Sequence, residues 1–230
     1  MSDSKTVSSK IIGVGSYVPE NIITNHDLEK MMNTNDEWIQ QRTGIVERRW
    51  VNDDQCTSDL ALSASLEAIK SAGIQKTDID MIVFATISPD YDFPGTGCFL
   101  QAKLGIPEIT VLDIRQQCTG FVYAMSTADK FIKSGSHKNV LVVGAEVQSK
   151  GLDKTPEGRN VGVLFGDGAG AIIMSACEVN DPKKDGHFID AHLHSDGAFA
   201  KELWLPAAGS AFESERFSQK MLDEKLHYAQ

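Results

Sequence analysis

Cys118 is the residue of this sequence whose position best suits a nucleophile. It follows a short apolar stretch at residues 111–114, and the segment after it has apolar residues at helical spacing, namely Phe121, Val122, Met125, Ala128, Phe131 and Ile132. This pattern predicts a strand, a turn and then a helix that ends at Gly135. A cysteine at the start of a helix lies where unpaired N–H groups collect positive charge, which favours the thiolate, the reactive form. The alternative is a core cysteine, because free cysteines are among the most buried residues.

The other three cysteines, Cys56, Cys98 and Cys177, lie far apart, and the sequence contains no C-x-x-C pair. This pattern argues against a zinc site, and we expect no metal. The N-terminus is polar and lacks the apolar segment of a secretory signal, so we expect a cytoplasmic protein without disulfides. We therefore interpret these three thiols as core or surface residues.

Composition excludes several classes of function. The 230 residues carry 22 Lys and Arg against 32 Asp and Glu, a net charge of −10, so an extended nucleic-acid interface is not expected. A local basic patch for an anionic ligand is still compatible with this total. No apolar run approaches about 18 residues, so no membrane-spanning helix is predicted.

Strands and helices alternate along the sequence around Cys118. Residues 81–87 are an uninterrupted apolar run, typical of a strand buried on both faces of a parallel sheet, and residues 139–146 (NVLVVGAE) predict another strand of this kind. Residues 58–72 and 98–104 predict helices, the first with a clear apolar face. We therefore expect an α/β protein with a mostly parallel sheet covered on both faces.

Two glycine-rich stretches could suggest a phosphate site. Gly13 and Gly15 follow a predicted strand at residues 10–14, but no helix opens there, so the dinucleotide-binding context fails. The segment 166–170 (GDGAG) lies between predicted strands at 161–165 and 171–176. We interpret it as a close-packing or hairpin turn rather than a phosphate cradle.

The character of the sequence changes after residue 178. Residues 179–186 are polar, 188–193 could form a strand and 194–197 a turn, and 201–230 are increasingly polar and end in a segment that reads as a helix. We predict one unit at residues 1–178 and the incomplete start of a second at 179–230. We expect the natural chain to continue.

Several blocks, read together and in order, resemble the 3-oxoacyl-[acyl-carrier-protein] synthase III family of thiolase-like condensing enzymes. They run from Lys10 to about Pro206 and read IIGVGSYVPENIITNHDLEKM, TNDEWIQQRTGI, DFPGTG, DIRQQCTGFVYAMSTADKFIKSG, VLVVGAE, FGDGAGA and HLHSDG. The resemblance implies a thiolase-like layered αβαβα fold, with the first half complete here and the second truncated. It also implies a homodimer.

The resemblance implies an acyltransferase. Cys118 would take the acyl group of a short acyl-CoA, acetyl-CoA in the first instance, and pass it to malonyl-acyl carrier protein in a decarboxylative Claisen condensation that initiates fatty-acid synthesis. No cofactor is implied, because the coenzyme A thioester is a substrate. The family also uses a histidine and an asparagine without counterparts here, so we expect these 230 residues to be inactive alone. The alternatives are an olefin- or polyketide-type synthase and a non-catalytic partner subunit.

Four residues match the family's coenzyme A site. Trp38 and Arg42 lie four apart on one predicted helix, Arg159 matches an arginine that stacks on the adenine, and Thr34 matches a threonine that contacts coenzyme A. A planar guanidinium suits such stacking. Thr34 is equally explained as a helix cap. The alternative for Trp38 is a core aromatic, which its place beside Arg42 on a short polar helix disfavours.

Three hydrophobic residues match positions of the family's acyl pocket. Phe93 matches a residue contributed by the neighbouring subunit, and Phe165 and Leu203 match pocket-lining positions. Ordinary core packing explains Leu203 equally well. The glutamines at 116 and 117, where many members have alanine, and the pair Gly97-Cys98 leave the acyl preference open.

Overall fold

The computed structural model describes residues 6–211 and 215–229, and these residues form two compact units that alternate along the chain. The first unit comprises the N-terminal strand to Pro19, Val51–Glu146 and Gly168–Leu193. The second comprises Glu20–Trp50, Val147–Asp167 and the part that begins at His194. The boundary predicted at residue 178 is a different division: it separates the first half of the thiolase-like fold from the start of the second half. That boundary stays a prediction.

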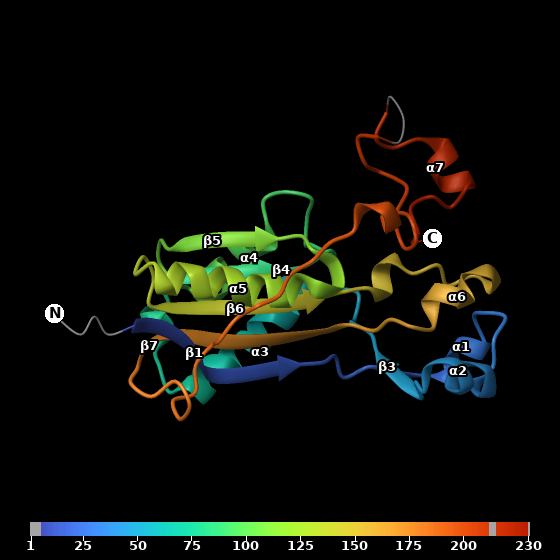
Figure 1. The fold of residues 1–230 in the computed structure, drawn as a ribbon. Helices are drawn as coiled ribbons and strands as arrows, with labels where there is room; N and C mark the ends of the chain where they lie inside the picture. The colour runs from blue at the N-terminus through green and yellow to red at the C-terminus, as the bar shows by residue number, and fades with distance from the viewer. Residues whose placement is uncertain (1–5, 212–214, 230) are drawn as a thin grey trace. The chain divides into compact units, whose positions relative to one another are not determined.

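A mixed sheet forms the centre of the first unit (Figure 1). In the described chain its strand order is β1-β7-β6-β4-β5, with bounds Thr6–Tyr17, Gly168–Val179, Asn139–Glu146, Met81–Ala85 and Thr110–Ile114. β4 pairs in parallel with β5 and β6, whereas β7 is antiparallel to both β6 and β1. β1 and β6 therefore run in the same direction, and among the described strands only β7 is reversed, so the expectation of a mostly parallel sheet holds with β7 as its exception. Apolar runs report burial on both faces, but they do not specify strand direction.

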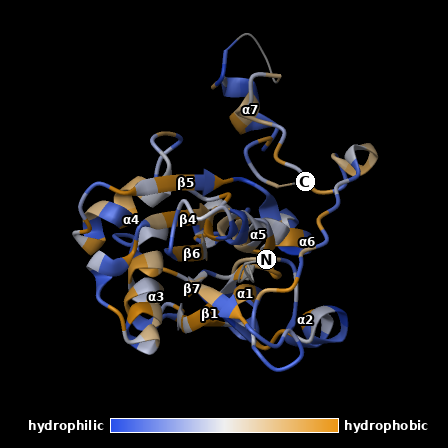
Figure 2. Ribbon diagram, turned by 60° about the vertical axis from the view of Figure 1, so that its left-hand side comes forward, coloured by the Kyte–Doolittle hydropathy of each residue, from blue (hydrophilic) through white to orange (hydrophobic). Residues whose placement is uncertain are grey.

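Helices cover both faces of this sheet. Helices α3 (Thr57–Ala72) and α4 (Thr96–Leu104) pack on one face, against Ile82, Phe84 and their neighbours. Helix α5 (Gly120–Lys133) packs on the other, against Met81, Val83 and Ala85. Because alternate residues of β4 face opposite layers, the whole strand is apolar, as its colour in Figure 2 shows. The layered arrangement predicted from the sequence is confirmed for this unit.

Gly13 and Gly15 belong to a close crossing between β1 and α3. A Cβ on Gly13 would meet Ala72 Cβ at 2.6 Å, and one on Gly15 would overlap the backbone of Ala64 and Ala68. These glycines therefore let a strand and a helix approach each other.

The second unit has small elements around a core of its own. They are β2 (Ile22–Thr24), α1 (Asn25–Glu29), α2 (Asp36–Thr43), β3 (Glu47–Arg49), α6 (Arg159–Gly162) and α7 (Gln219–Asp223). Thr24 forms a capping box at the start of α1. The core contains Leu28, Met32, Ile39, Trp50, Leu152 and Val163.

Three local expectations differ from the structure. Residues 161–165 do not form a strand, because α6 begins at Arg159 and a turn follows it; a short apolar run cannot by itself separate the two states. Residues 188–193 have no regular structure, although Phe188 N donates to Ser9 O at 2.7 Å. Helix α7 ends at Asp223, and turns occupy the residues that follow.

Candidate functional site

Cys118 lies in a short turn between β5 and α5. Residues Gln117–Thr119 form one turn of 3-10 helix, and α5 begins at Gly120. Gln117 has a φ of +43°, in the left-handed region that non-glycine residues rarely adopt. Thr119 Oγ1 donates to Gln116 O at 3.0 Å, and the Cys118 side chain is exposed. The core-cysteine alternative therefore does not describe this thiol in the structure.

The turn is positioned by the carboxyl ends of three neighbouring parallel strands. Ala85 of β4 is in register with Ile114 of β5 and with Gly144 of β6. A Cβ built on Gly120 would lie 3.2 Å from Ala85 Cβ, so the first residue of α5 rests on the end of β4. In open α/β sheets this edge is where ligands bind.

Glu146 ends β6 at the same edge, and it was not among the residues predicted for the site. Its carboxylate accepts hydrogen bonds from Ile87 N at 3.0 Å, Ser88 N at 3.1 Å and the hydroxyls of Thr86 and Ser88. Burial raises the pKa of Glu146, although these hydrogen bonds oppose the shift. The sequence signal that could have identified Glu146 is a carboxylate at the end of a predicted buried strand, because the ends of parallel strands meet at the edge of the sheet where Cys118 was expected.

Phe93 lies in the loop after β4. Its side chain is 82% exposed, and Tyr91 nearby is 64% exposed. The described part of the first unit therefore gives the Phe93 ring little cover, which is consistent with a position that contacts another molecule.

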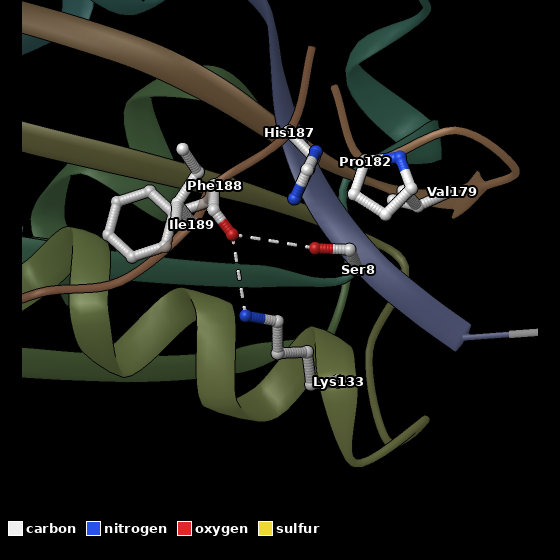
Figure 3. A pocket seen from close by; sticks show the side chains of 7 residues that line it. All are labelled: Ser8, Lys133, Val179, Pro182, His187, Phe188 and Ile189. Carbon is white, nitrogen blue, oxygen red and sulfur yellow. Dashed lines mark hydrogen bonds between the residues drawn. The ribbon is translucent and has the colours of Figure 1, made fainter. Parts of the chain in front are cut away.

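The first unit also contains a pocket of about 210 Å³ (Figure 3). Its lining residues are Ser8, Lys133, Val179, Pro182, His187, Phe188 and Ile189. Ser8 Oγ and Lys133 Nζ both donate to Phe188 O, at 3.5 and 3.4 Å. Lys133 is the last residue of α5, and a helix of 14 residues rises about 21 Å, so this pocket and Cys118 are at opposite ends of the helix.

The second unit brings Trp38, Arg42 and Arg159 together. The guanidinium carbons of Arg42 and Arg159 lie 4.4 and 4.7 Å from the Trp38 ring centroid. Arg42 is one helical turn after Trp38 on α2, and Arg159 is the first residue of α6, where its Nη1 donates to Asn33 O at 2.9 Å. The half-buried Trp38 also packs against the core of this unit. The arrangement offers one indole and two fixed cations to an aromatic, anionic ligand.

Thr34 is not the cap of α2. Asn35 is, because its side-chain oxygen accepts from Trp38 N at 2.8 Å. The Thr34 hydroxyl is buried and has no hydrogen-bond partner among the described residues. The capping explanation for Thr34 is therefore wrong, and the role of this hydroxyl in binding stays a prediction.

Phe165 and Leu203 have different surroundings. Phe165 is half-buried and packs against the core of the second unit, and its carbonyl accepts from Trp50 Nε1 at 3.4 Å. Leu203 is 57% exposed, so core packing does not explain it. The GDGAG stretch is a packing device: a Cβ on Gly166 would lie 3.1 Å from Arg48 Cβ, and Asp167 accepts from Ser149 N.

No helix in residues 6–211 and 215–229 is both long and apolar enough to cross a lipid bilayer.

Comparison with known proteins identifies the family. Residues 112–197 match the family model described as 3-oxoacyl-[acyl-carrier-protein (ACP)] synthase III. The chain is 49% identical over 207 residues to a beta-ketoacyl-[acyl-carrier-protein] synthase III of Xanthomonas campestris pv. campestris (strain 8004), a match that covers 90% of this chain and 61% of the relative. The chain thus spans about three fifths of that relative's length.

Solved structures give the same result. A 3-oxoacyl-(acyl carrier protein) synthase III of Pseudomonas aeruginosa PAO1 superposes with a TM-score of 0.82 at 31% identity, over 97% of this chain and 64% of the other. A beta-ketoacyl-[acyl carrier protein] synthase III of Thermus thermophilus does so with a TM-score of 0.76 at 34% identity, over 94% and 67%. The fold is thiolase-like, and the chain belongs to the 3-oxoacyl-[acyl-carrier-protein] synthase III family.

Proposed function

We propose that the protein transfers a short acyl group from coenzyme A, through a thioester on Cys118, to the carbon of a malonyl-acyl carrier protein that loses carbon dioxide. The observation that carries this proposal is the exposed Cys118 in a turn at the carboxyl ends of β4, β5 and β6. A residue held in a sparsely populated backbone conformation, here Gln117, is a frequent feature of functional turns.

The first step is nucleophilic acyl transfer. The Cys118 thiolate attacks the thioester carbonyl of the acyl-CoA, the carbon–sulfur bond to coenzyme A breaks, and coenzyme A leaves as its thiol. The Cys118 backbone N–H holds the developing oxyanion, and one such donor contributes about 2.7–4 kcal/mol of transition-state stabilisation in enzymes where it has been removed.

The second unit holds coenzyme A in this proposal. The adenine stacks on Trp38, and Arg42 and Arg159 contact the stacked base and the phosphates. The two guanidiniums within 5 Å of the indole support this assignment. The half-buried position of Thr34 beside α2 is compatible with a further contact.

The second step passes the acyl group to the malonyl-derived carbanion and forms 3-oxoacyl-acyl carrier protein. It draws on a histidine and an asparagine of the family that have no counterpart in these 230 residues. The acyl pocket is completed by Phe165, Leu203 and Phe93 from a second subunit of a homodimer. The exposure of Phe93 supports its placement.

The test is incubation of the complete enzyme with radiolabelled acetyl-CoA, followed by digestion and mapping of the label. We expect one acetyl group on Cys118 that hydroxylamine releases, and none in Cys118→Ala. Cys98→Ala is the matched control, because Cys98 is also exposed and should be dispensable. A wild-type enzyme whose Cys118 stays unlabelled, with its thiols intact, would rule out the proposal and favour a non-catalytic subunit.

A further inference from the structure

The loop of residues 86–95 has an exposed tip, and its base is held by many hydrogen bonds. It leaves the end of β4, and its tip carries Tyr91 and Phe93, whose side chains are 64% and 82% exposed. Ordering a loop costs conformational entropy, so a loop whose tip is exposed keeps one orientation only when contacts at its base hold it.

The N-terminus of α3 holds one side of this base. Thr57 Oγ1 donates to Ser88 O. Ser58 N donates to Asp90 at 2.9 Å, and Ser58 Oγ also donates to that carboxylate. Asp90 N in turn donates to Thr96 Oγ1 at 3.0 Å, which joins the beginning of the loop to the start of α4.

Glu146 holds the other side from β6. Its carboxylate accepts from two backbone N–H groups, of Ile87 and Ser88, and from the hydroxyls of Thr86 and Ser88. All four donors lie in the first three residues after β4. The hydrogen bonds therefore fix the direction in which the chain leaves the sheet.

Both side-chain oxygens of Glu146 act as hydrogen-bond acceptors in these contacts. Ile87 N bonds Oε1, whereas Ser88 N and both hydroxyls bond Oε2. A glutamine of the same shape has only one acceptor oxygen, and its amide group would face N–H or O–H donors. Burying a carboxylate is costly, so a residue that only filled space at this position would be apolar.

The same contacts reach the nucleophile turn. Thr86 N donates to Ile114 O at 3.3 Å, at the end of the strand that leads to Cys118. Ala85, the residue before Thr86, lies against Gly120 at the start of α5. Glu146 thus braces the segment that lies between the Cys118 turn and the Phe93 loop.

We propose that Glu146 is a positioning residue that determines acyl-chain specificity: its carboxylate fixes residues 86–88 and thereby the placement of the Phe93 loop relative to the acyl group. This inference rests on the proposed function, because it presumes that Cys118 is acylated and that Phe93 borders the acyl chain. Glu146 itself need not touch the substrate.

The experiment compares the complete wild-type enzyme with Glu146→Gln in two assays. The first measures kcat/KM for acylation of Cys118 by acetyl-CoA and by hexanoyl-CoA. The second measures the rate at which iodoacetamide alkylates Cys118, which needs no acyl pocket. We expect the acetyl-to-hexanoyl ratio to change by about tenfold in Glu146→Gln, the scale on which pocket shape discriminates substrates. We expect the alkylation rate to stay within about twofold.

Asp129→Asn is the matched control for a purely structural effect. Asp129 is a fully buried carboxylate at the far end of α5, where it accepts from Ser9 Oγ at 2.7 Å and pairs with Lys133 at 3.0 Å. Its loss should lower stability and leave the acyl ratio unchanged. If Glu146→Gln does not fold, Ser88→Ala replaces it, since this change removes one donor and leaves the carboxylate in place.

The outcomes separate the two proposals. A variant that is acylated with the wild-type acetyl-to-hexanoyl ratio would overturn the role of Glu146 and leave the proposed function intact. Additive effects of Glu146→Gln and Phe93→Ala on this ratio would also overturn the role of Glu146, because two residues that act through one another have non-additive effects. Wild-type enzyme that takes no acyl group from either thioester would instead overturn the proposed function.

Discussion

At the scale of single residues, the second unit places two cations beside one indole in a protein whose net charge is negative. Arg42 and Arg159 both approach Trp38, and neither has a carboxylate partner in the described ion pairs. Arg159 is anchored through Asn33 O, so its guanidinium is already oriented before a ligand arrives. Such pre-organisation lowers the entropic cost of binding.

Replacement of Trp38 by alanine should weaken binding of the coenzyme A ester and leave the chemical step nearly intact. Base–aromatic stacking is worth about 1–3 kcal/mol, so KM should rise by about tenfold or more while kcat changes little. Phe217→Ala is the control, because Phe217 is an exposed aromatic beneath Arg216 that has no part in the site. Steady-state kinetics that show a fall in kcat at constant KM would contradict the stacking role.

Replacement of Cys118 by alanine should remove acylation without unfolding the protein. The side chain is exposed, and surface substitutions usually change stability by less than about 0.5 kcal/mol. Urea unfolding of the variant and the wild type should therefore give overlapping curves. A loss of several kcal/mol would show that the thiol has a packing role.

At the scale of elements, α4 illustrates a helix start that depends on another element. Its N-cap is Gly95, which offers no side chain, and the Gly97 N–H donates to Asp113 of β5 at 3.1 Å. A carboxylate at a helix N-terminus accepts a hydrogen bond from an otherwise unpaired N–H group, and its negative charge interacts favourably with the helix dipole. Burial nevertheless raises the pKa of Asp113.

The raised pKa of Asp113 has a defined consequence for stability. The folded state binds the Asp113 proton more tightly than the unfolded state, so this contribution is full below the ordinary carboxyl pKa and is lost as pH rises through the raised value. The Asp113→Asn variant cannot bind this proton, so its stability lacks this dependence on pH. We therefore expect the unfolding free energy of the variant, relative to that of the wild type, to increase as pH rises from the ordinary carboxyl pKa through the raised pKa of Asp113. Urea titrations at several pH values measure it, and a relative decrease would contradict the direction of the shift.

Gly15→Ala should be strongly destabilising, because the new methyl group would overlap the backbone of α3 at Ala64 and Ala68. Overpacking of this kind typically costs about 1–3 kcal/mol. Gly170→Ala is the matched control in β7, since a Cβ there would have no described atom within 4 Å beyond its chain neighbours. Equal urea midpoints for the two variants would show that β1 can move away from α3.

The sequence specified some of these elements and left others open for physical reasons. The apolar runs predicted β4 and β6, and Gly135, which has a left-handed backbone, follows the end of α5 as predicted. The run at 161–165 was misassigned because its length suits a strand or a buried helical turn. Glu146 was missed because its partners, residues 86–88, lie about 60 positions away, and such pairings leave no periodic signal.

At the scale of the whole molecule, the residues proposed for acyl transfer and those proposed for coenzyme A binding belong to different units. Cys118 and Glu146 are in the first unit, and Trp38, Arg42 and Arg159 are in the second. The units alternate along the chain, so β6 passes directly into residues 147–167 and returns as β7. The chain therefore connects the Glu146 end of the sheet directly to the segment that carries Arg159.

The 230 residues should be inactive alone in the condensation, although Cys118 can still be acylated. The resemblance assigns Cys118 and the coenzyme A residues to this sequence but matches none of its residues to the family's histidine and asparagine, so we expect the malonyl carbanion to lack its stabilising groups. With labelled acetyl-CoA and malonyl-acyl carrier protein, we expect a single burst of at most one coenzyme A released per chain and no 3-oxoacyl product. Chromatography of the carrier-protein fraction measures the product, and Cys118→Ala defines the background. Continued formation of 3-oxoacyl-acyl carrier protein by this chain would mean that other side chains, among them the six histidines, support the second step.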